Sequence, residues 1–115
     1  MSGLALPVPV NYTKLGAEPL RTIAGSTFTG AYQQLSPLAF PAVILRFLNN
    51  SSVAVTISYD GVHDADVILA GSEFTLNIAA NRTTNFFFNL PKGSPLYIKA
   101  SAGTGSFYVA SYYAY

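Results

Sequence analysis

Apolar and polar residues alternate with a period of two along much of this chain, and this pattern restricts the fold more than any other feature of the sequence. In a strand, successive side chains point to opposite faces, so each alternating run predicts a strand with one buried face. The pattern is clearest at residues 53–59, VAVTISY. No window shows a sustained helical periodicity. Further strands are predicted at residues 22–29, 42–48, 74–78, 84–90, 96–100 and 107–112.

Turn-forming residues separate these runs at short intervals. Residues 49–52, NNSS, predict a hairpin turn because Asn tolerates a positive φ angle, and residues 103–105, GTG, predict a second hairpin. Asp60-Gly61 is a strong turn dipeptide. Seven or eight short strands separated in this way indicate an all-β fold, either an antiparallel sandwich or a barrel. Other turns are predicted at residues 71–72, 81–82 and 91–95.

The first twenty residues depart from this pattern. Residues 4–10, LALPVPV, are apolar and contain two prolines, which cannot donate to the hydrogen-bond ladder of a central strand. Two interpretations are open: the segment is an extended arm laid on a neighbouring subunit, or it is an edge strand of its own domain. The chain of 115 residues has the length of one domain. We therefore assign residues 1–20 to the arm or edge segment and residues 21–115 to a β-sandwich domain.

Charged residues are scarce, at 10% of the chain against about 25% in an average soluble domain. Six Lys and Arg residues and five Asp and Glu residues give a formal net charge of +1. A free monomer usually carries more charge, so this composition indicates an exterior largely covered by other protein; a neutral surface rich in Ser, Thr and Asn is the alternative. The basic residues are scattered singly, which disfavours nucleic-acid binding. No apolar stretch is long enough to span a membrane.

The densest group of polar side chains lies at residues 60–66, DGVHDAD, where three carboxylates and the only histidine fall together. Such a loop could bind a calcium ion, but its spacing does not match the EF-hand pattern. We interpret it as a connection between strands, in which Asp60 sets the turn and Asp64 or Asp66 caps backbone amides. A pH-sensitive role for His63 at an interface is a further alternative. No metal or cofactor is predicted.

The sequence also predicts that the chain is not an enzyme. A serine triad needs a base, and His63 is the only imidazole, with no Gly-x-Ser-x-Gly motif beside it. Paired-carboxylate catalysis needs acids on opposing cleft walls, whereas three of the five acids share one loop. The chain has no cysteine, which excludes a cysteine nucleophile, a thiolate zinc site and disulfide bonds.

Tyrosines crowd the C-terminus, and we expect Tyr97 to lie near them in the sheet. Tyrosine is enriched in protein interfaces because it offers a large contact area at low entropic cost. Stacking on sugars and plain cross-strand packing are the alternatives. The predicted interface residues combine these tyrosines with the apolar residues of the N-terminal segment: Leu4, Leu6, Val8, Val10, Tyr97, Tyr108, Tyr112, Tyr113 and Tyr115.

Four segments together resemble a known group of proteins: VAVTISYDGVHD at 53–64, LAG at 69–71, LPKGSPLYIK at 90–99 and GTGSFYVASYY at 103–113. Small virion structural proteins of tailed bacteriophages carry a similar run. In them, a strand ends in Ser-x-Asp-Gly, and an Asp-containing loop, a Pro-x-Gly before a Tyr-x-Lys strand, and a terminal Gly-Thr-Gly hairpin follow. The resemblance covers roughly residues 41–113.

This resemblance implies a jelly-roll-like β-sandwich that assembles on the phage particle and has no enzymatic role. Within the group, a capsid cement or decoration protein is expected, which stabilises the head by bridging capsid subunits. Its expected partners are itself, as a homotrimer, and the major capsid protein, but neither nucleic acid nor membrane. It would be made in the host cytoplasm and lie on the capsid exterior. The alternatives are a tail, head–tail adaptor or fibre component, or a carbohydrate- or receptor-binding module.

Overall fold

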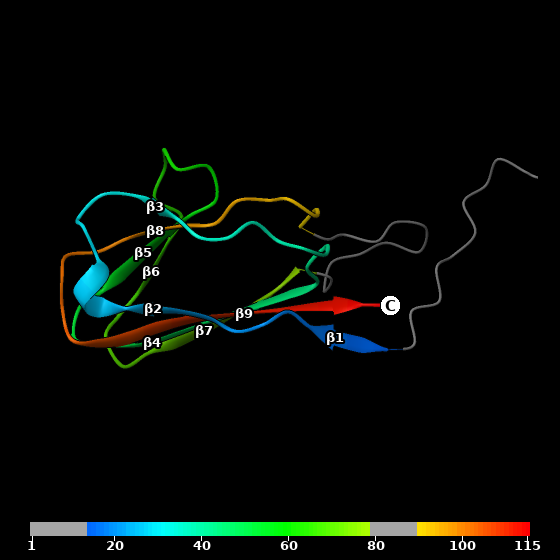
Figure 1. The fold of residues 1–115 in the computed structure, drawn as a ribbon, viewed down its shortest axis with the longest axis horizontal. Coiled ribbons are helices and arrows are strands. Elements are labelled where there is room, and N and C mark those ends of the chain that lie inside the picture. The colour runs from blue at the N-terminus through cyan, green and yellow to red at the C-terminus, as the bar shows by residue number, and fades with distance from the viewer. Residues whose placement is uncertain (1–13, 79–89) are drawn as a thin grey trace, which may run out of the picture.

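A computed structural model describes residues 14–78 and 90–115 of the chain. In these ranges the chain forms two antiparallel sheets that pack face to face (Figure 1). The prediction of an all-β sandwich is therefore confirmed. No helix in the described ranges is long and apolar enough to cross a membrane.

The two sheets differ in size, and we call them the large sheet and the small sheet. The large sheet has the order β1-β9-β4-β7, with β2 also paired to β9, and the small sheet has the order β3-β8-β5-β6. A short 3-10 turn, η1 (Gly25–Thr27), follows β2. The strands are β1 (Leu15–Ala17), β2 (Arg21–Ala24), β3 (Gln33–Gln34), β4 (Ile44–Ser51), β5 (Val55–Ser58), β6 (Asp66–Ile68), β7 (Glu73–Asn77), β8 (Tyr97–Lys99) and β9 (Gly105–Ala114).

Strand β9 is the centre of the large sheet. On one side it pairs with β4, from Ile44 opposite Tyr112 to Ser51 opposite Gly105. On the other side β1 and β2 follow each other along its edge. They are separated at Pro19, which has no N–H to donate to a ladder. Both β1 and β2 are therefore edge strands, and β9 and β4 are fixed on both sides.

The core lies between the two sheets. Alternation along β4 and β9 turns Phe47, Phe107 and Val109 inward, and each of them is completely buried. Val55, Ile57 and Ile98 meet them from the small sheet. Burial of one such side chain stabilises the fold by about 1.5–3 kcal/mol. The alternation that predicted these strands is thus the pattern that builds the core.

The predicted hairpin turn at residues 49–52 is wrong. Strand β4 continues through Asn49 to Ser51, and β4 and β5 belong to different sheets. Asn49 is completely buried, and its amide nitrogen donates to the carbonyls of Val53 and Ile68, each at 2.8 Å. Its Oδ1 accepts from the backbone N–H of Ser51 at 3.0 Å. Asn49 therefore holds the crossing between the sheets through its side chain and not through a positive φ angle.

The predicted hairpin at residues 103–105 is also wrong, because it connects β8 of the small sheet with β9 of the large sheet. Gly105 has a φ angle of +75°, and a side chain there would collide with the carbonyl oxygen of Asn50. The strand predicted at 22–29 ends early, at Ala24, because the backbone of Gly25 lies against this turn: the N–H of Gly103 donates to its carbonyl at 3.0 Å.

Three strands, β1, β3 and β6, have no counterpart among the predicted strands. The predicted strand at 84–90 lies outside the described residues except for Leu90, which forms an isolated bridge with Ala42. The predicted turn at 81–82 also lies outside them. Asp60-Gly61 is confirmed as a turn: it lies in the connection between the paired strands β5 and β6, and Gly61 has a φ angle of +76°.

Candidate functional site

The outer face of the large sheet carries a group of largely apolar side chains along β4 and β9, interrupted by Arg46. Because Phe107 and Val109 point inward, the alternate residues of β9 point away from the core. They lie directly opposite the outward residues of β4. We call this set the outer face, and it consists of the cross-strand pairs Ile44–Tyr112, Arg46–Ala110 and Leu48–Tyr108, together with Leu20 beside them.

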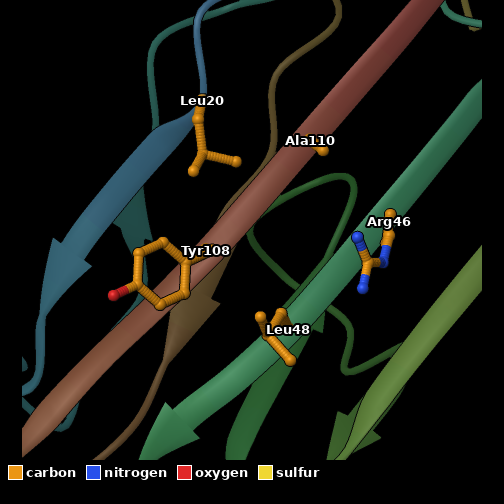
Figure 2. Close-up of a pocket in the computed structure, with 5 residues that line it drawn as sticks. All are labelled: Leu20, Arg46, Leu48, Tyr108 and Ala110. Carbon is orange, nitrogen blue, oxygen red and sulfur yellow. The ribbon is translucent and has the colours of Figure 1, made fainter.

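A hollow of about 180 Å³ lies in the outer face (Figure 2). Leu20, Leu48 and Tyr108 surround it, and the small side chain of Ala110 leaves it open. Leu20 comes from the connection between β1 and β2, and 56% of its surface is exposed. The hollow can therefore accept apolar side chains of a partner, because its walls are aliphatic and aromatic.

The one charged side chain that lines the hollow is Arg46. Its guanidinium pairs with Glu73 of β7 at 2.6 Å, which directs it along the sheet towards β7. The Glu73 carboxylate raises the pKa of Arg46 above its usual value. Arg46 is thus already partnered within the chain. Aliphatic and aromatic side chains form most of the lining of the hollow, so the hollow is suited to apolar contact.

The predicted interface tyrosines fall into three places rather than one. Tyr108 and Tyr112 lie on the outer face. Tyr113 stacks on Phe40, with ring centroids 4.0 Å apart. The ring centroid of Tyr115 lies 5.8 Å from that of Tyr113, at the C-terminal end of β9.

Tyr97 is in the small sheet, so the expectation that it lies near the other tyrosines is wrong. The sequence could not show this, because the turn at 103–105 passes from one sheet to the other. The remaining predicted interface residues lie outside the described part of the chain: Leu4, Leu6, Val8 and Val10.

In the loop at residues 60–66, Asp60 sets the turn as predicted. Its Oδ1 accepts from the backbone N–H groups of Val62 and His63, both at 2.8 Å, and its Oδ2 lies 2.7 Å from the His63 ring. These hydrogen bonds hold the pKa of Asp60 well below its usual range. The contact between the Asp60 carboxylate and the His63 ring raises the pKa of His63.

The other two carboxylates of the loop bind side chains and not backbone amides, which corrects the prediction. Asp64 accepts from the hydroxyl of Tyr32 and pairs with Lys99 at 2.9 Å. Asp66 accepts from the hydroxyl of Tyr59 at 3.4 Å. Burial raises the pKa of Tyr59 to about 12. Each carboxylate thus has its own partner, and the described residues hold no group of three acids or histidines close enough to bind a metal ion.

Tyr32, Asp64 and Lys99 form a cluster that the sequence did not reveal. The ammonium group of Lys99 lies 4.7 Å from the centre of the Tyr32 ring, and Tyr97 meets the same ring edge-on at 6.5 Å. The cluster connects the loop at 60–66 with the segment before β3. Its members are far apart in sequence, so no local pattern could have predicted it.

Comparison with protein-family models, with curated proteins and with solved structures found no match. The function must therefore be inferred from the chain's own residues.

Proposed function

We propose that this chain is a non-enzymatic virion structural protein of a tailed bacteriophage, most specifically a capsid cement or decoration protein. It forms a homotrimer and binds the major capsid protein on the exterior of the head. The resemblance of residues 41–113 to small phage virion proteins supports the phage assignment. The outer face supports assembly, and it is the observation that carries the proposal.

The composition of the outer face favours burial against protein. Leu20, Leu48, Tyr108 and Tyr112 offer aliphatic and aromatic surface, and the Arg46–Glu73 pair neutralises the charge beside them. Contiguous apolar patches on soluble proteins mark interaction sites, and tyrosine and arginine are the residues that interfaces prefer. A face of this kind suits contact with sister subunits or with a shell.

The strand order supports the jelly-roll part of the proposal. If β1 and β2 are counted as one interrupted edge strand, each sheet contains four strands. From β2 to β5 the chain passes between the sheets at every step. Eight strands in two packed sheets are typical of jelly rolls, which recur in viral capsid domains.

Cementing follows from symmetry and multivalency. A trimer matches a local threefold axis of a shell, so each of its three copies meets an equivalent site. Once one copy binds, the others bind at high effective concentration, and three weak contacts add to a strong one. The rigid sandwich keeps the three contacts in register, which stabilises the shell without any chemical step.

Carbohydrate binding is the alternative from another class, and the structure offers the Tyr32–Tyr97 pair as its best candidate. A sugar ring stacks on an open aromatic face, however, and Lys99 already lies over the Tyr32 ring. The geometry therefore favours assembly over sugar binding.

Native mass spectrometry of the purified full chain, followed by co-sedimentation with phage heads, tests the proposal. We expect a trimer that sediments with the heads and no binding on a glycan array. A stable monomer without affinity for heads would refute the cement assignment. A ring of higher symmetry would favour an adaptor or tail component.

A further inference from the structure

We propose that the hollow in the outer face binds residues 4–10 of a second copy of this chain. This inference rests on the proposed function in one respect, namely that the chain assembles with itself. It goes further because it assigns a donor segment and an acceptor site. Three features support it: the chemistry of the hollow, the chemistry of the segment, and the direction of β1 along β9.

The hollow accepts side chains rather than a strand. It lies on the face of the sheet, between β9, β4 and the connection before β2, where the backbone hydrogen bonds of β9 are already made on both sides. A partner therefore cannot bind here by extending the sheet. It must bind through apolar side chains placed against Leu20, Leu48 and Tyr108.

Residues 4–10 have the matching chemistry. The sequence LALPVPV contains no charged or hydrogen-bonding side chain. Leu4, Leu6, Val8 and Val10 occupy every second position, so in an extended chain they share one side. Proline fixes its own φ angle and favours extended conformations, which lowers the entropic cost of binding.

The direction of β1 favours a second copy over the chain's own hollow. Leu15 lies opposite Ala114 and Ala17 opposite Tyr112, so β1 runs from the C-terminal end of β9 towards the hollow. Lys14 and Tyr115 exchange two backbone hydrogen bonds of 2.9 Å at that end. Lys14 therefore lies at the end of β9 that is away from the hollow.

The distance adds to this argument. The hollow lies at residues 108–110 of β9, four to six residues from Ala114, which corresponds to about 14–20 Å along the strand. For the chain's own segment to reach it, the chain would have to reverse direction within the few residues before Lys14. A sister copy approaches without this reversal. If each copy donates its segment to the next, the contact is heterologous, and three copies close it into the proposed trimer.

Disulfide trapping tests this inference cleanly, because the chain contains no cysteine of its own. We would combine Val8→Cys with Leu48→Cys in the full chain and allow mild oxidation. The matched control combines Val8→Cys with Val67→Cys, since Val67 is 58% exposed on β6 of the small sheet. Circular dichroism checks that both variants fold, and non-reducing gel electrophoresis separates crosslinks between copies from crosslinks within one.

We expect crosslinks between copies in the Leu48 variant, formed about tenfold faster or more than in the Val67 control, because docking raises the local thiol concentration. Crosslinks only within single chains would show that the segment fills its own hollow and would overturn the inference. Equal rates in both variants, or no crosslink, would also overturn it. Native mass spectrometry of the unsubstituted chain separates the two proposals: a trimer without the Leu48 crosslink removes only the inference, whereas a monomer removes both.

Discussion

Side chains make different kinds of contact in two regions of the molecule, namely the outer face of the large sheet and the loop at residues 60–66 beside the small sheet. The loop contains three acids, and each accepts a hydrogen bond from a neighbour within the chain. The outer face presents leucine and tyrosine side chains around an open hollow, and its single ion pair is also internal. The acids of the loop and the Arg46–Glu73 pair therefore make contacts within the chain, whereas the leucines and tyrosines around the hollow form the surface that we propose for a partner.

Neighbouring residues of β4 show the same contrast within one strand. Leu48 points outward and lines the hollow, whereas Asn49 points inward and holds the crossing between the sheets. In our proposal the first serves assembly, whereas the hydrogen bonds of the second serve folding. Substitutions at these two positions separate the two roles.

The largest effect on stability is expected for Asn49→Ala. The substitution removes the buried amide donor from the carbonyls of Val53 and Ile68, and of the two only Val53 keeps another side-chain donor, the Ser51 hydroxyl at 3.0 Å. We expect the free energy of unfolding to fall by about 3 kcal/mol, since buried polar groups without partners are costly. Urea unfolding at fixed protein concentration measures it. Asn50→Ala is the control, because Asn50 is exposed on the same strand, and an equal loss in both variants would contradict the assigned role.

Leu48→Asp should have a smaller effect, and on a different property. A carboxylate in the hollow opposes apolar contact, so we expect assembly to weaken by about 2 kcal/mol, roughly thirtyfold. The stability of the isolated subunit should change by less than about 0.5 kcal/mol. Sedimentation velocity over a dilution series measures the assembly. Val67→Asp on the small sheet is the control, and weaker assembly in that variant as well would remove the distinction between the two faces.

Tyr32→Phe tests the contacts that hold the loop at residues 60–66. It removes the hydroxyl that donates to Asp64 but keeps the ring beneath Lys99. We expect faster amide hydrogen exchange at residues 59–65, because the Tyr32–Asp64 hydrogen bond restrains the loop. We expect unchanged assembly, because the cluster lies beside the small sheet and not on the outer face. Mass spectrometry of peptic fragments measures the exchange. Slower assembly with unchanged exchange would place the partner on the small sheet instead.

The smallest effect concerns pH. The depressed pKa of Asp60 stabilises the fold above the unfolded value of about 3.9, and this stabilisation is lost as the pH falls through the folded value. The raised pKa of His63 stabilises the fold below the unfolded pKa of about 6.5. This stabilisation is lost as the pH rises through the pKa of His63 in the folded protein. We expect a modest maximum of the melting temperature between these limits. His63→Ala should remove the decline on the alkaline side, and an unchanged decline would exclude this pair as its cause.

Periodicity predicted the strands with long alternating runs. Residues 53–59 and 107–112 contain β5 and most of β9, because the pattern that marks them also forms the core. Strands β1, β3 and β6 have only two or three residues each. Unlike β8, which is also short, they lie in no longer alternating run, and they form because a neighbouring strand offers free hydrogen-bonding groups.

The residues of the outer face were predicted only in part, because the positions of some of them depend on pairings between segments that are distant in sequence. Tyr108 and Tyr112 were identified by residue type, and they lie on the outer face. Leu20, Leu48 and Arg46 were not identified, since their place beside Tyr108 depends on the register between β4 and β9 and on the path before β2. Asn49 was misread as a turn residue because its hydrogen bonds reach Ile68, which is distant in sequence. Pairings of this kind are set by the whole fold and leave no local signal.

Hydroxyl-radical footprinting tests most directly whether the outer face is covered by sister molecules. The oxidation of Tyr108 and Tyr112 is compared with that of Tyr97, first at high protein concentration and then after dilution to monomers. We expect strong protection of Tyr108 and Tyr112 in the assembled sample, which is lost on dilution, and equal oxidation of Tyr97 in both. Oxidation of Tyr108 and Tyr112 that does not depend on concentration, or protection of Tyr97 alone, would contradict the account.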